Sequence, residues 1–335
     1  MSRRMVRFAT IGAGFQTEQS ILPSLRFTDL ELVAVCDLDE ERARVVGSRH
    51  GALRTYTDYQ KMLASEEIDA VSVVGPPELH HEAGLAVLES GRHLFVEKPP
   101  APDLAKARQI QAAAASRGLQ VMVGFMKRHA HAYVRARELS TRPGFGRRTM
   151  LRLNYSHVHY ASLREHAIFM TVHGLDLARY FMGDVAGGSV AKREIDGNYV
   201  IALLVQHEDG GFSQITLSTH EPRVQESVEL VGESALIQVT NLTELRYHPR
   251  ASTWEDVQST DESMVSLWYP EFAIPIEYTS NHVLQGYAGQ LRHFANALAA
   301  GEAVSPNIDD GVEAMRLAEA LCDAPDGITP LRLRD

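Results

Sequence analysis

Short apolar runs alternate with amphipathic segments along the first third of the chain. The apolar runs predict buried strands at residues 6–11, 32–36, 70–74, 93–96 and 119–123. The segments between them have helical periodicity at 40–50, 82–90 and 104–116, and Gly118 is a suitable helix stop after the last of these. Strands that alternate with helices predict an α/β fold with a doubly wound parallel sheet and right-handed crossovers.

The pattern changes after residue 124. Helices are expected at 133–139, 172–181, 287–300 and 311–322, and strands at 149–155, 199–207, 212–218, 227–231 and 235–239. Asp209-Gly210-Gly211 is a hairpin signal between two of these strands. Successive strands joined by tight turns indicate an α+β domain with a mostly antiparallel sheet. We therefore expect one domain at 1–123 and a second at 124–335.

Composition narrows the class of protein. A chain of 335 residues is long enough for two domains. The formal charge of −10 argues against a nucleic-acid partner, which needs a basic face. Two cysteines far apart in the chain fit a reducing compartment. No apolar run approaches the roughly 20 residues of a membrane span, and no secretory apolar core is evident. We expect a cytoplasmic protein with a small-molecule partner and no membrane partner.

A glycine-rich turn follows the first predicted strand. In Gly12-Ala13-Gly14 the first glycine permits a tight turn, and the second lets the backbone approach a pyrophosphate at a helix N-terminus. Asp37 ends the second strand, where a carboxylate accepts hydrogen bonds from the adenosine ribose. Because a 2′-phosphate there would meet like charge, NAD is favoured over NADP, although Arg42 is close enough to accommodate one.

Two further loops follow later strands of the same sheet. Residues 75–80 and then Glu97-Lys98-Pro99 stand at the carboxyl edge of the strands, where ligands bind in open α/β folds. A lysine fixed at this edge can hydrogen-bond a substrate oxygen and stabilise alkoxide-like charge. The combination indicates a nicotinamide enzyme that acts on a hydroxyl or carbonyl carbon.

These motifs resemble those of the sugar and polyol oxidoreductases that include glucose–fructose oxidoreductase and inositol dehydrogenase, the Gfo/Idh/MocA family. The resemblance implies an N-terminal Rossmann domain, a C-terminal domain with an open sheet, and a homodimer or homotetramer joined through that sheet. It also implies a cis Lys98–Pro99 bond and places Lys98 beside the nicotinamide. The segments that carry it are 6–17, 34–43, 75–80, 91–99, 123–128, 173–176, 287–298 and 309–321. The expected cofactor contacts are Gly12, Gly14, Phe15, Gln16, Asp37, Pro76, His80, Glu97 and Lys98.

His173 is the predicted proton carrier, but two residues just before it differ from the family pattern. His173 matches the active-site histidine, and an imidazole titrates near working pH. The aspartate expected four residues earlier is Phe169, and Thr171 replaces a common glycine. Asp176 lies three residues after His173, on the same face of a helix, and is a candidate to orient it.

Several polar and aromatic side chains are candidates to contact the substrate. The Lys127-Arg128 pair matches the family's basic pair, which suits a hydroxyl-rich or anionic group. His157, His159 and His166 are close in sequence, but no cysteine or carboxylate completes a zinc-type spacing, so no metal is expected. The predicted substrate contacts are Lys127, Arg128, Tyr155, His157, Phe169 and Asp176.

The sequence thus predicts an NAD-dependent dehydrogenase that reversibly oxidises a secondary hydroxyl of a cyclic sugar, amino sugar or polyol. Lys98 would polarise the oxygen, and His173 would act as acid and base. Two alternatives stay open. One is a sugar enzyme that retains NAD and cleaves a glycosidic bond through a transient ketone. The other is a cofactor-binding sensor without turnover, and the feature that supports it is Phe169 at the position of the expected aspartate.

Overall fold

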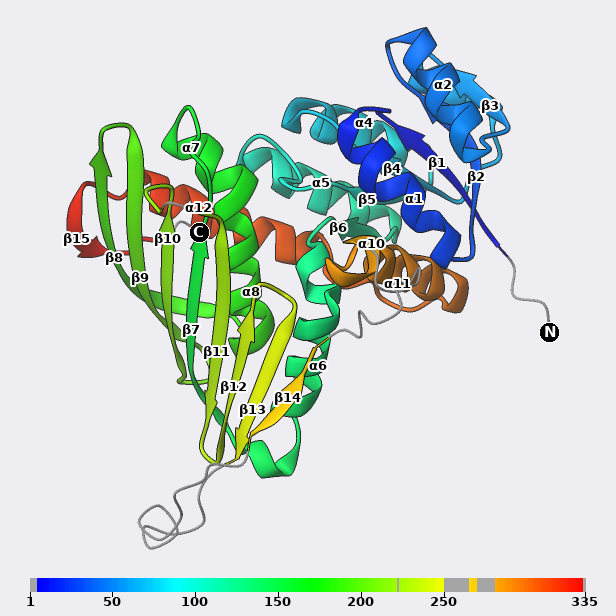
Figure 1. Cartoon of the computed structure of the whole chain (residues 1–335). Helices are drawn as coiled ribbons and strands as arrows, with labels where there is room; N and C mark the ends of the chain where they lie inside the picture. The colour runs from blue at the N-terminus through cyan, green and yellow to red at the C-terminus, as the bar shows by residue number, and fades with distance from the viewer. Residues whose placement is uncertain (1–4, 222, 250–264, 270–280, 334–335) are drawn as a thin grey trace, which may run out of the picture. The chain divides into compact units, whose positions relative to one another are not determined.

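The computed structural model describes residues 5–221, 223–249, 265–269 and 281–333 (Figure 1). The chain forms two compact units, and each is described by itself. The first unit comprises Met1–Met126 and Gly286–Arg316, and the second comprises Lys127–Gln285 and Leu317–Asp335. Within the described ranges, no helix combines the length and apolarity that a bilayer crossing requires.

The first unit is built on a six-stranded parallel sheet of order β3-β2-β1-β4-β5-β6. Every neighbouring pair is parallel, which confirms the predicted doubly wound sheet. The strand order reverses between β1 and β4, and this switch point creates a crevice at the carboxyl ends of the strands. The strands are β1 (Val6–Ile11), β2 (Leu30–Cys36), β3 (Arg54–Tyr56), β4 (Ala70–Val73), β5 (His93–Val96) and β6 (Val121–Val123).

Local sequence signals explain the helix ends of this unit. The side chains of Asp39, Asp58 and Asp103 accept hydrogen bonds from first-turn backbone N–H groups of α2, α3 and α5. Gly51 and Gly118 end α2 and α5 in the left-handed conformation. The helices are η1 (Thr17–Ile21), α1 (Leu22–Ser24), η2 (Leu25–Phe27), α2 (Glu40–His50), α3 (Tyr59–Ser65), α4 (Pro77–Glu89) and α5 (Leu104–Arg117).

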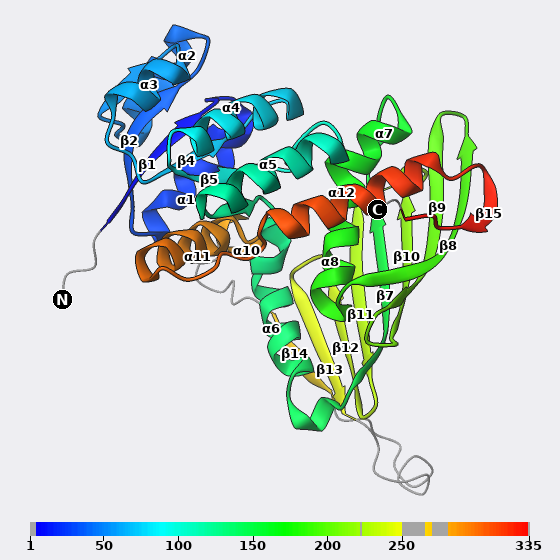
Figure 2. The same cartoon turned by 180° about the vertical axis from the view of Figure 1, so that it is seen from behind.

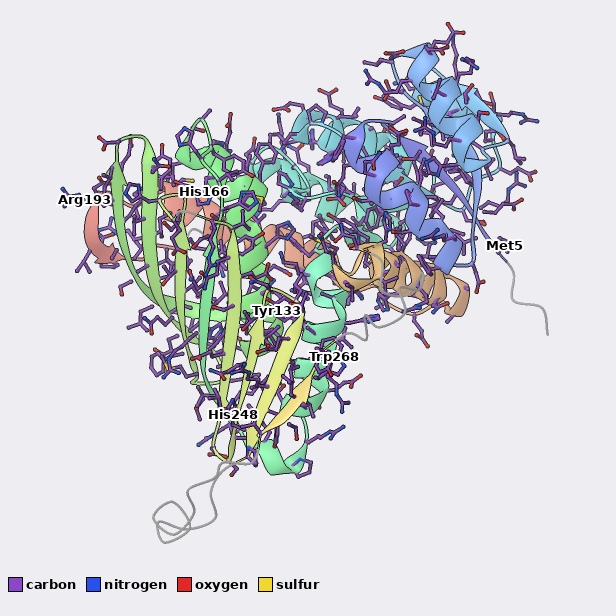
Figure 3. The ribbon with its side chains drawn as sticks, viewed as in Figure 1. Met5, Tyr133, His166, Arg193, His248 and Trp268 are labelled. Carbon is purple, nitrogen blue, oxygen red and sulfur yellow. The ribbon has the colours of Figure 1, made fainter. Side chains whose placement is uncertain are left out.

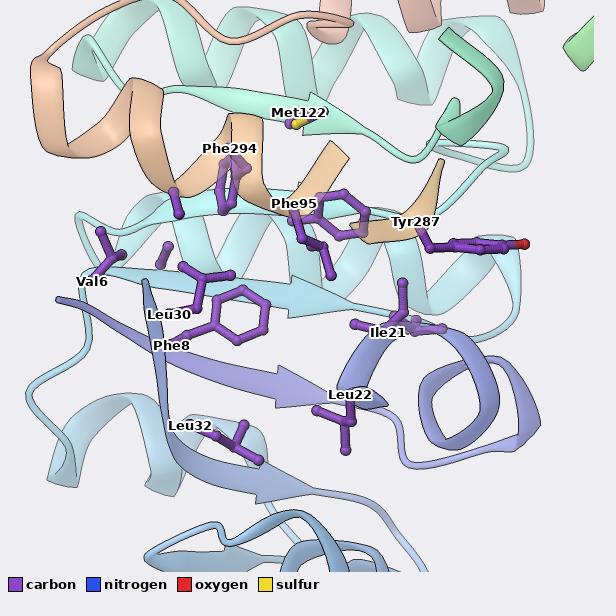
Figure 4. Close-up of a cluster of buried hydrophobic side chains, with 14 of the residues drawn as sticks. Val6, Phe8, Ile21, Leu22, Leu30, Leu32, Phe95, Met122, Tyr287 and Phe294 are labelled. Carbon is purple, nitrogen blue, oxygen red and sulfur yellow. The ribbon is translucent and has the colours of Figure 1, made fainter. Parts of the chain in front are cut away.

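A helix from late in the chain completes the core of the first unit. α11 (Tyr287–Ala300) contributes Phe294, which packs edge-on against Phe95 of β5 with ring centroids 5.9 Å apart (Figure 4). Phe8, Phe95 and Phe294 are fully buried, and burial stabilises each by roughly 1.5–3 kcal/mol. This helix lies within the range expected for the second domain, yet it packs with the parallel sheet.

The second unit holds a nine-stranded sheet of order β14-β13-β12-β11-β7-β10-β9-β8-β15. Only β7 and β10 run parallel among the paired strands of the described ranges, so the sheet is mostly antiparallel as predicted. The strands are β7 (Arg148–Ser156), β8 (Val185–Ile195), β9 (Asn198–His207), β10 (Phe212–Ser218), β11 (Gln225–Gly232), β12 (Ala235–Thr240), β13 (Glu244–Pro249), β14 (Ser266–Trp268) and β15 (Gly327–Pro330).

Helices lie on one face of this sheet (Figure 2). α8 (Val172–Met182) packs on β7 and β10, and α6 (His131–Ser140) packs on β12 and β13. The opposite face has a polar hollow of about 500 Å³ lined by residues such as Arg152, Gln214 and Glu229. The other helical segments are η3 (Met126–His129), η4 (Pro143–Phe145), α7 (Leu163–His166), η5 (Ala167–Thr171), α10 (Asn281–Leu284) and α12 (Ile308–Asp323), the last divided between the two units.

Candidate active site

The glycine turn after β1 has the geometry of a dinucleotide cradle. Gly12 has φ +93°, and a Cβ there would lie 1.9 Å from the carbonyl oxygen of Val74, so the fold itself requires glycine. A Cβ on Gly14 would meet no atom within 4 Å. Packing therefore does not explain Gly14, whereas close approach of a pyrophosphate does. Thr17, in place of the third glycine, donates a hydrogen bond of 2.7 Å to the Gly12 carbonyl and closes the turn.

A cavity of about 640 Å³ opens beside this turn. Of the predicted cofactor contacts, Gly12, Gly14, Asp37 and Pro76 line it. Phe15 lies outside the lining and is 80% exposed. A cavity at the switch point, lined by a glycine turn and a strand-end carboxylate, fits an adenine dinucleotide.

Asp37 is held in place by three groups. One carboxylate oxygen accepts a hydrogen bond from Ala13 N at 2.8 Å, and the other accepts from Asp39 N at 3.0 Å. Arg42 reaches the second oxygen at 3.4 Å and also pairs with Asp39. The carboxylate therefore braces the glycine turn and keeps the Arg42 guanidinium, which is half exposed, engaged with acidic partners.

Substituting Asp37 by asparagine is expected to move cofactor preference toward NADP by at least about tenfold. The amide keeps an acceptor for Ala13 N–H but removes the charge that repels a 2′-phosphate and holds Arg42. Parallel Kd measurements for NADH and NADPH check this, with Glu40→Gln as a neighbouring exposed control. An unchanged Kd ratio would contradict the assignment of Asp37.

The Glu97-Lys98-Pro99 loop is fixed by buried side chains. The Lys98–Pro99 bond is cis, which confirms the expectation from the resemblance. Lys98 N donates to a carboxylate oxygen of Glu97 at 3.2 Å. The Nδ1 of His80 lies 2.7 Å from the carbonyl oxygen of Pro99, and Gly75 N donates to Nε2 at 3.0 Å. Since Nε2 accepts, Nδ1 carries the proton, and His80 is a neutral link between the two loops.

His80 predicts a loss of stability in mild acid. Burial lowers the pKa of His80 to about 4, although its bond to Pro99 opposes the shift. An unfolded histidine titrates near 6.5, so the unfolded state gains the proton first as pH falls. The contribution of neutral His80 to the free energy of unfolding is fully present above about pH 6.5 and is lost toward pH 4. Its size is on the order of 3 kcal/mol. The free energy of unfolding, measured in urea between pH 7 and pH 4, is expected to depend less on pH in His80→Gln than in the unchanged protein. Equal slopes would contradict this role.

In the second unit, His173 lies on α8 directly after a π-helical turn. The segment α7–η5–α8 is a continuous helical stretch, and η5 contains Phe169 and Thr171, the two positions that depart from the family pattern. π-turns often occur at functional sites because they shift the helix face. His173 is 3% exposed, and Phe169 is partly exposed.

The basic pair predicted to contact the substrate is engaged with buried carboxylates. Arg128 donates from Nε to one oxygen of Asp176 at 2.9 Å and from a terminal nitrogen to the other at 2.6 Å. Lys127 forms an ion pair with Glu226, which also accepts from the Tyr133 hydroxyl at 2.5 Å. All five side chains are buried. Both oxygens of Asp176 thus bind Arg128, and the local charge is balanced.

Aromatic rings extend from this ion pair toward the end of β7. The Lys127 ammonium lies 5.0 Å from the ring centre of Tyr155. The ring centres of Tyr155 and His157 are 6.4 Å apart, and those of His157 and Tyr160 are 5.9 Å apart. The ring centres of Tyr160 and His166 are 5.6 Å apart. Figure 3 shows His166 at this end of the sheet and Tyr133 beside the middle of its strands. Burial, with the nearby His157, lowers the pKa of His166 to about 4. The sequence named His166 as a possible contributor to the site and Tyr160 as a hydrogen-bonding candidate, because both lie in a histidine- and tyrosine-rich segment. Tyr133 and Glu226 were not predicted.

Among the described residues, no group of three or more histidines, cysteines or acidic residues is arranged to hold a metal ion. His159 makes a hydrogen bond to Asn198 at 3.3 Å and is exposed.

The parallel sheet, glycine turn and strand-end aspartate define an NAD-binding Rossmann domain of an oxidoreductase. Residues 6–125 match the model of the Gfo/Idh/MocA family, described as an oxidoreductase family with an NAD-binding Rossmann fold.

Relatives and solved structures extend the similarity over the whole chain. Inositol 2-dehydrogenase 3 of Saccharopolyspora erythraea is 25% identical over 98% of this chain and 96% of its own. D-apiose dehydrogenase of Paraburkholderia graminis is 29% identical over 73% of this chain and 70% of its own. A solved dehydrogenase from Chromobacterium violaceum superposes with a TM-score of 0.87 at 25% identity, covering 95% of this chain and 94% of that one.

Proposed function

We propose that this enzyme is an NAD-dependent dehydrogenase that reversibly oxidises a secondary hydroxyl of a cyclic sugar, amino sugar or polyol. The observation that carries this is the combination of a cavity that fits a dinucleotide with Lys98 on a loop held by hydrogen bonds at the same edge of the parallel sheet. The names of the two curated relatives, an inositol and an apiose dehydrogenase, support the substrate class.

The proposed roles divide between two side chains. Lys98 donates a hydrogen bond to the substrate oxygen and stabilises the negative charge that develops on it. His173 accepts the hydroxyl proton during oxidation and returns it during reduction. Gly12, Gly14 and Asp37 hold the cofactor by its pyrophosphate and ribose. Bound NAD supplies the hydride acceptor.

The second unit favours a substrate without negative charge. Lys127 and Arg128, the predicted basic pair, are each matched by a buried carboxylate, Glu226 and Asp176. Because a carboxylate already neutralises each of these cations, they attract an anionic substrate less than unpaired cations would. Tyr155, His157 and Tyr160 provide ring faces and hydrogen-bonding groups that suit hydroxyl-rich molecules.

The same proposal includes assembly and location. A homodimer or homotetramer through the open face of the nine-stranded sheet would cover exposed apolar side chains such as Leu204 and Phe212, which are 50% and 45% exposed. A cytoplasmic location agrees with the free thiols of Cys36 and Cys322.

The test is reduction of NAD and NADP, side by side, on free, phosphorylated, amino and nucleotide-linked sugars and on inositols. Turnover with NAD on members without phosphate is expected, and loss of turnover in both Lys98→Ala and His173→Ala supports the two roles. Turnover confined to phosphorylated sugars would reject the proposal that the substrate carries no negative charge. Activity unchanged in both variants would reject the mechanism.

A further inference from the structure

The backbone of Lys98 and Pro99 is held at both ends by buried side chains of the first unit. At one end, a carboxylate oxygen of Glu97 accepts the Lys98 N–H at 3.2 Å. At the other, His80 binds the Pro99 carbonyl through Nδ1 and the Gly75 N–H through Nε2. Glu97 is 4% exposed and His80 is 1% exposed. Both were predicted to contact the cofactor, but the hydrogen bonds described above join them to the backbone of the two loops.

We propose that Glu97 and His80 are positioning residues for Lys98, and that the charge on Glu97 tunes the Lys98 ammonium. This inference rests on the proposed function of Lys98. A side chain can polarise a substrate oxygen effectively only when its backbone is fixed to within a fraction of an ångström. Glu97 and His80 supply that constraint from opposite sides of the same dipeptide.

The packing around Glu97 is shaped to its carboxyl group. A Cβ on Gly124 would lie 2.8 Å from the carboxyl carbon of Glu97 and 2.9 Å from each oxygen. Glycine at 124 therefore leaves the space that the carboxyl group occupies. The charged and titratable groups that act on Glu97 are Lys98 on its own loop and Tyr287 on α11, whose hydroxyl accepts from Gln16 at 3.0 Å.

The charge of Glu97 changes near neutral pH. Burial raises the pKa of Glu97 to about 7, while the Lys98 charge and backbone N–H oppose the shift. Above pH 7 the carboxylate accepts a charge-assisted bond from Lys98 N–H and attracts the ammonium group. Below pH 7 the neutral acid accepts a weaker bond. No described residue donates to the second oxygen of Glu97, so that oxygen carries the proton in the neutral form.

Glu97→Gln reproduces the shape of the neutral acid and removes the titration. In the unchanged protein, kcat is expected to fall as pH drops through about 7. In Glu97→Gln, kcat at pH 8 is expected to be about tenfold lower, with a smaller fall in kcat through pH 7 than in the unchanged protein and a Kd for NADH within twofold. Glu89→Gln, on the exposed side of α4, serves as control. A wild-type profile in Glu97→Gln would overturn the proposal, and so would weaker NADH binding with kcat retained.

A second readout does not depend on turnover. Acetic anhydride labels deprotonated amines, and mass spectrometry compares Lys98 with Lys61, whose side chain is 79% exposed. At pH 8, Lys98 is expected to be labelled three- to tenfold faster in Glu97→Gln, because the carboxylate no longer stabilises the ammonium. An unchanged labelling ratio would overturn the proposal even if no substrate is turned over, so this failure is distinguishable from failure of the proposed function.

His80 is tested by His80→Phe, which keeps a ring and removes both hydrogen bonds. The expected result is a fall of at least tenfold in kcat with the Kd for NADH within twofold, while His81→Phe leaves both unchanged. Weaker NADH binding with kcat retained would show that His80 contacts the cofactor and would reject its role in positioning Lys98. If thermal unfolding shows that His80→Phe does not fold, the isosteric Glu97→Gln variant decides.

Discussion

Replacing Lys98 by alanine is expected to lower kcat for NAD reduction by about a hundred- to a thousandfold. Removing one preorganised donor to a developing oxyanion has an effect of this size in other enzymes. Binding of NADH is expected to change little, because Gly12, Gly14 and Asp37 line the cavity that would hold it. Steady-state kinetics on the best substrate of the panel, with a parallel Kd for NADH, measure both quantities.

Two further variants define what the lysine supplies. Lys98→Arg keeps a positive charge but replaces a compact ammonium with a planar guanidinium, so activity is expected to stay near that of Lys98→Ala. Lys61→Ala removes an exposed lysine of the same unit and is expected to leave kcat unchanged. A fall of less than tenfold in Lys98→Ala would contradict the role given to Lys98.

The largest expected effect on stability comes from Asp176. Substituting Asp176 by alanine leaves the Arg128 guanidinium buried without the carboxylate that binds it at 2.6 and 2.9 Å. An uncompensated buried charge costs about 3–5 kcal/mol of the free energy of unfolding. Urea unfolding followed by circular dichroism measures the difference.

The control for this prediction is an exposed pair in the same unit. Arg135 and Glu138 pair on the surface of α6, with side chains 40% and 57% exposed, so Glu138→Ala is expected to change stability by less than about 1 kcal/mol. The double variant Arg128→Met with Asp176→Leu removes both charges and is expected to recover much of the loss. A cost below about 1 kcal/mol in Asp176→Ala would show that the pair does not stabilise the unit.

Periodicity and turn residues predicted most of the parallel sheet of the first unit and several of its helices. The strands at 6–11 and 93–96 and the helix at 40–50 were placed with their observed bounds, because strongly apolar runs lie between clear caps. The helix expected at 82–90 begins earlier, at Pro77, where proline occupies a first-turn position. β3 was missed because it has only three residues, all of them exposed or half-buried.

The second unit was harder to predict. β8 carries two consecutive glycines, Gly187 and Gly188, which are poor strand formers. A Cβ on Gly188 would lie 2.3 Å from the carbonyl oxygen of Leu204, so close approach to β9 explains the residue there. A single sequence contains no signal for this tertiary contact. β13, β14 and β15, near the sheet edges, were also missed, and β15 includes a proline.

The sequence identified several residues of the site but not the residues with which they form ion pairs. Lys127, Arg128 and Asp176 were singled out, but their ion pairs join residues 99 and 48 positions apart in the chain. Pairing over such distances depends on the tertiary fold, which no local pattern encodes. Glu226 is a polar residue at a buried strand position and could be recognised only once its strand register was known.

A single-turnover reaction with a substrate deuterated at the reacting carbon tests the central claim most directly. The account predicts one equivalent of deuterated NADH for each equivalent of a ketone product with its carbon skeleton intact. Glycosidic cleavage with the cofactor returned to NAD would contradict it in favour of the transient-ketone enzyme. Tight NAD binding with the label retained in unreacted substrate, across the whole panel, would contradict it in favour of a sensor.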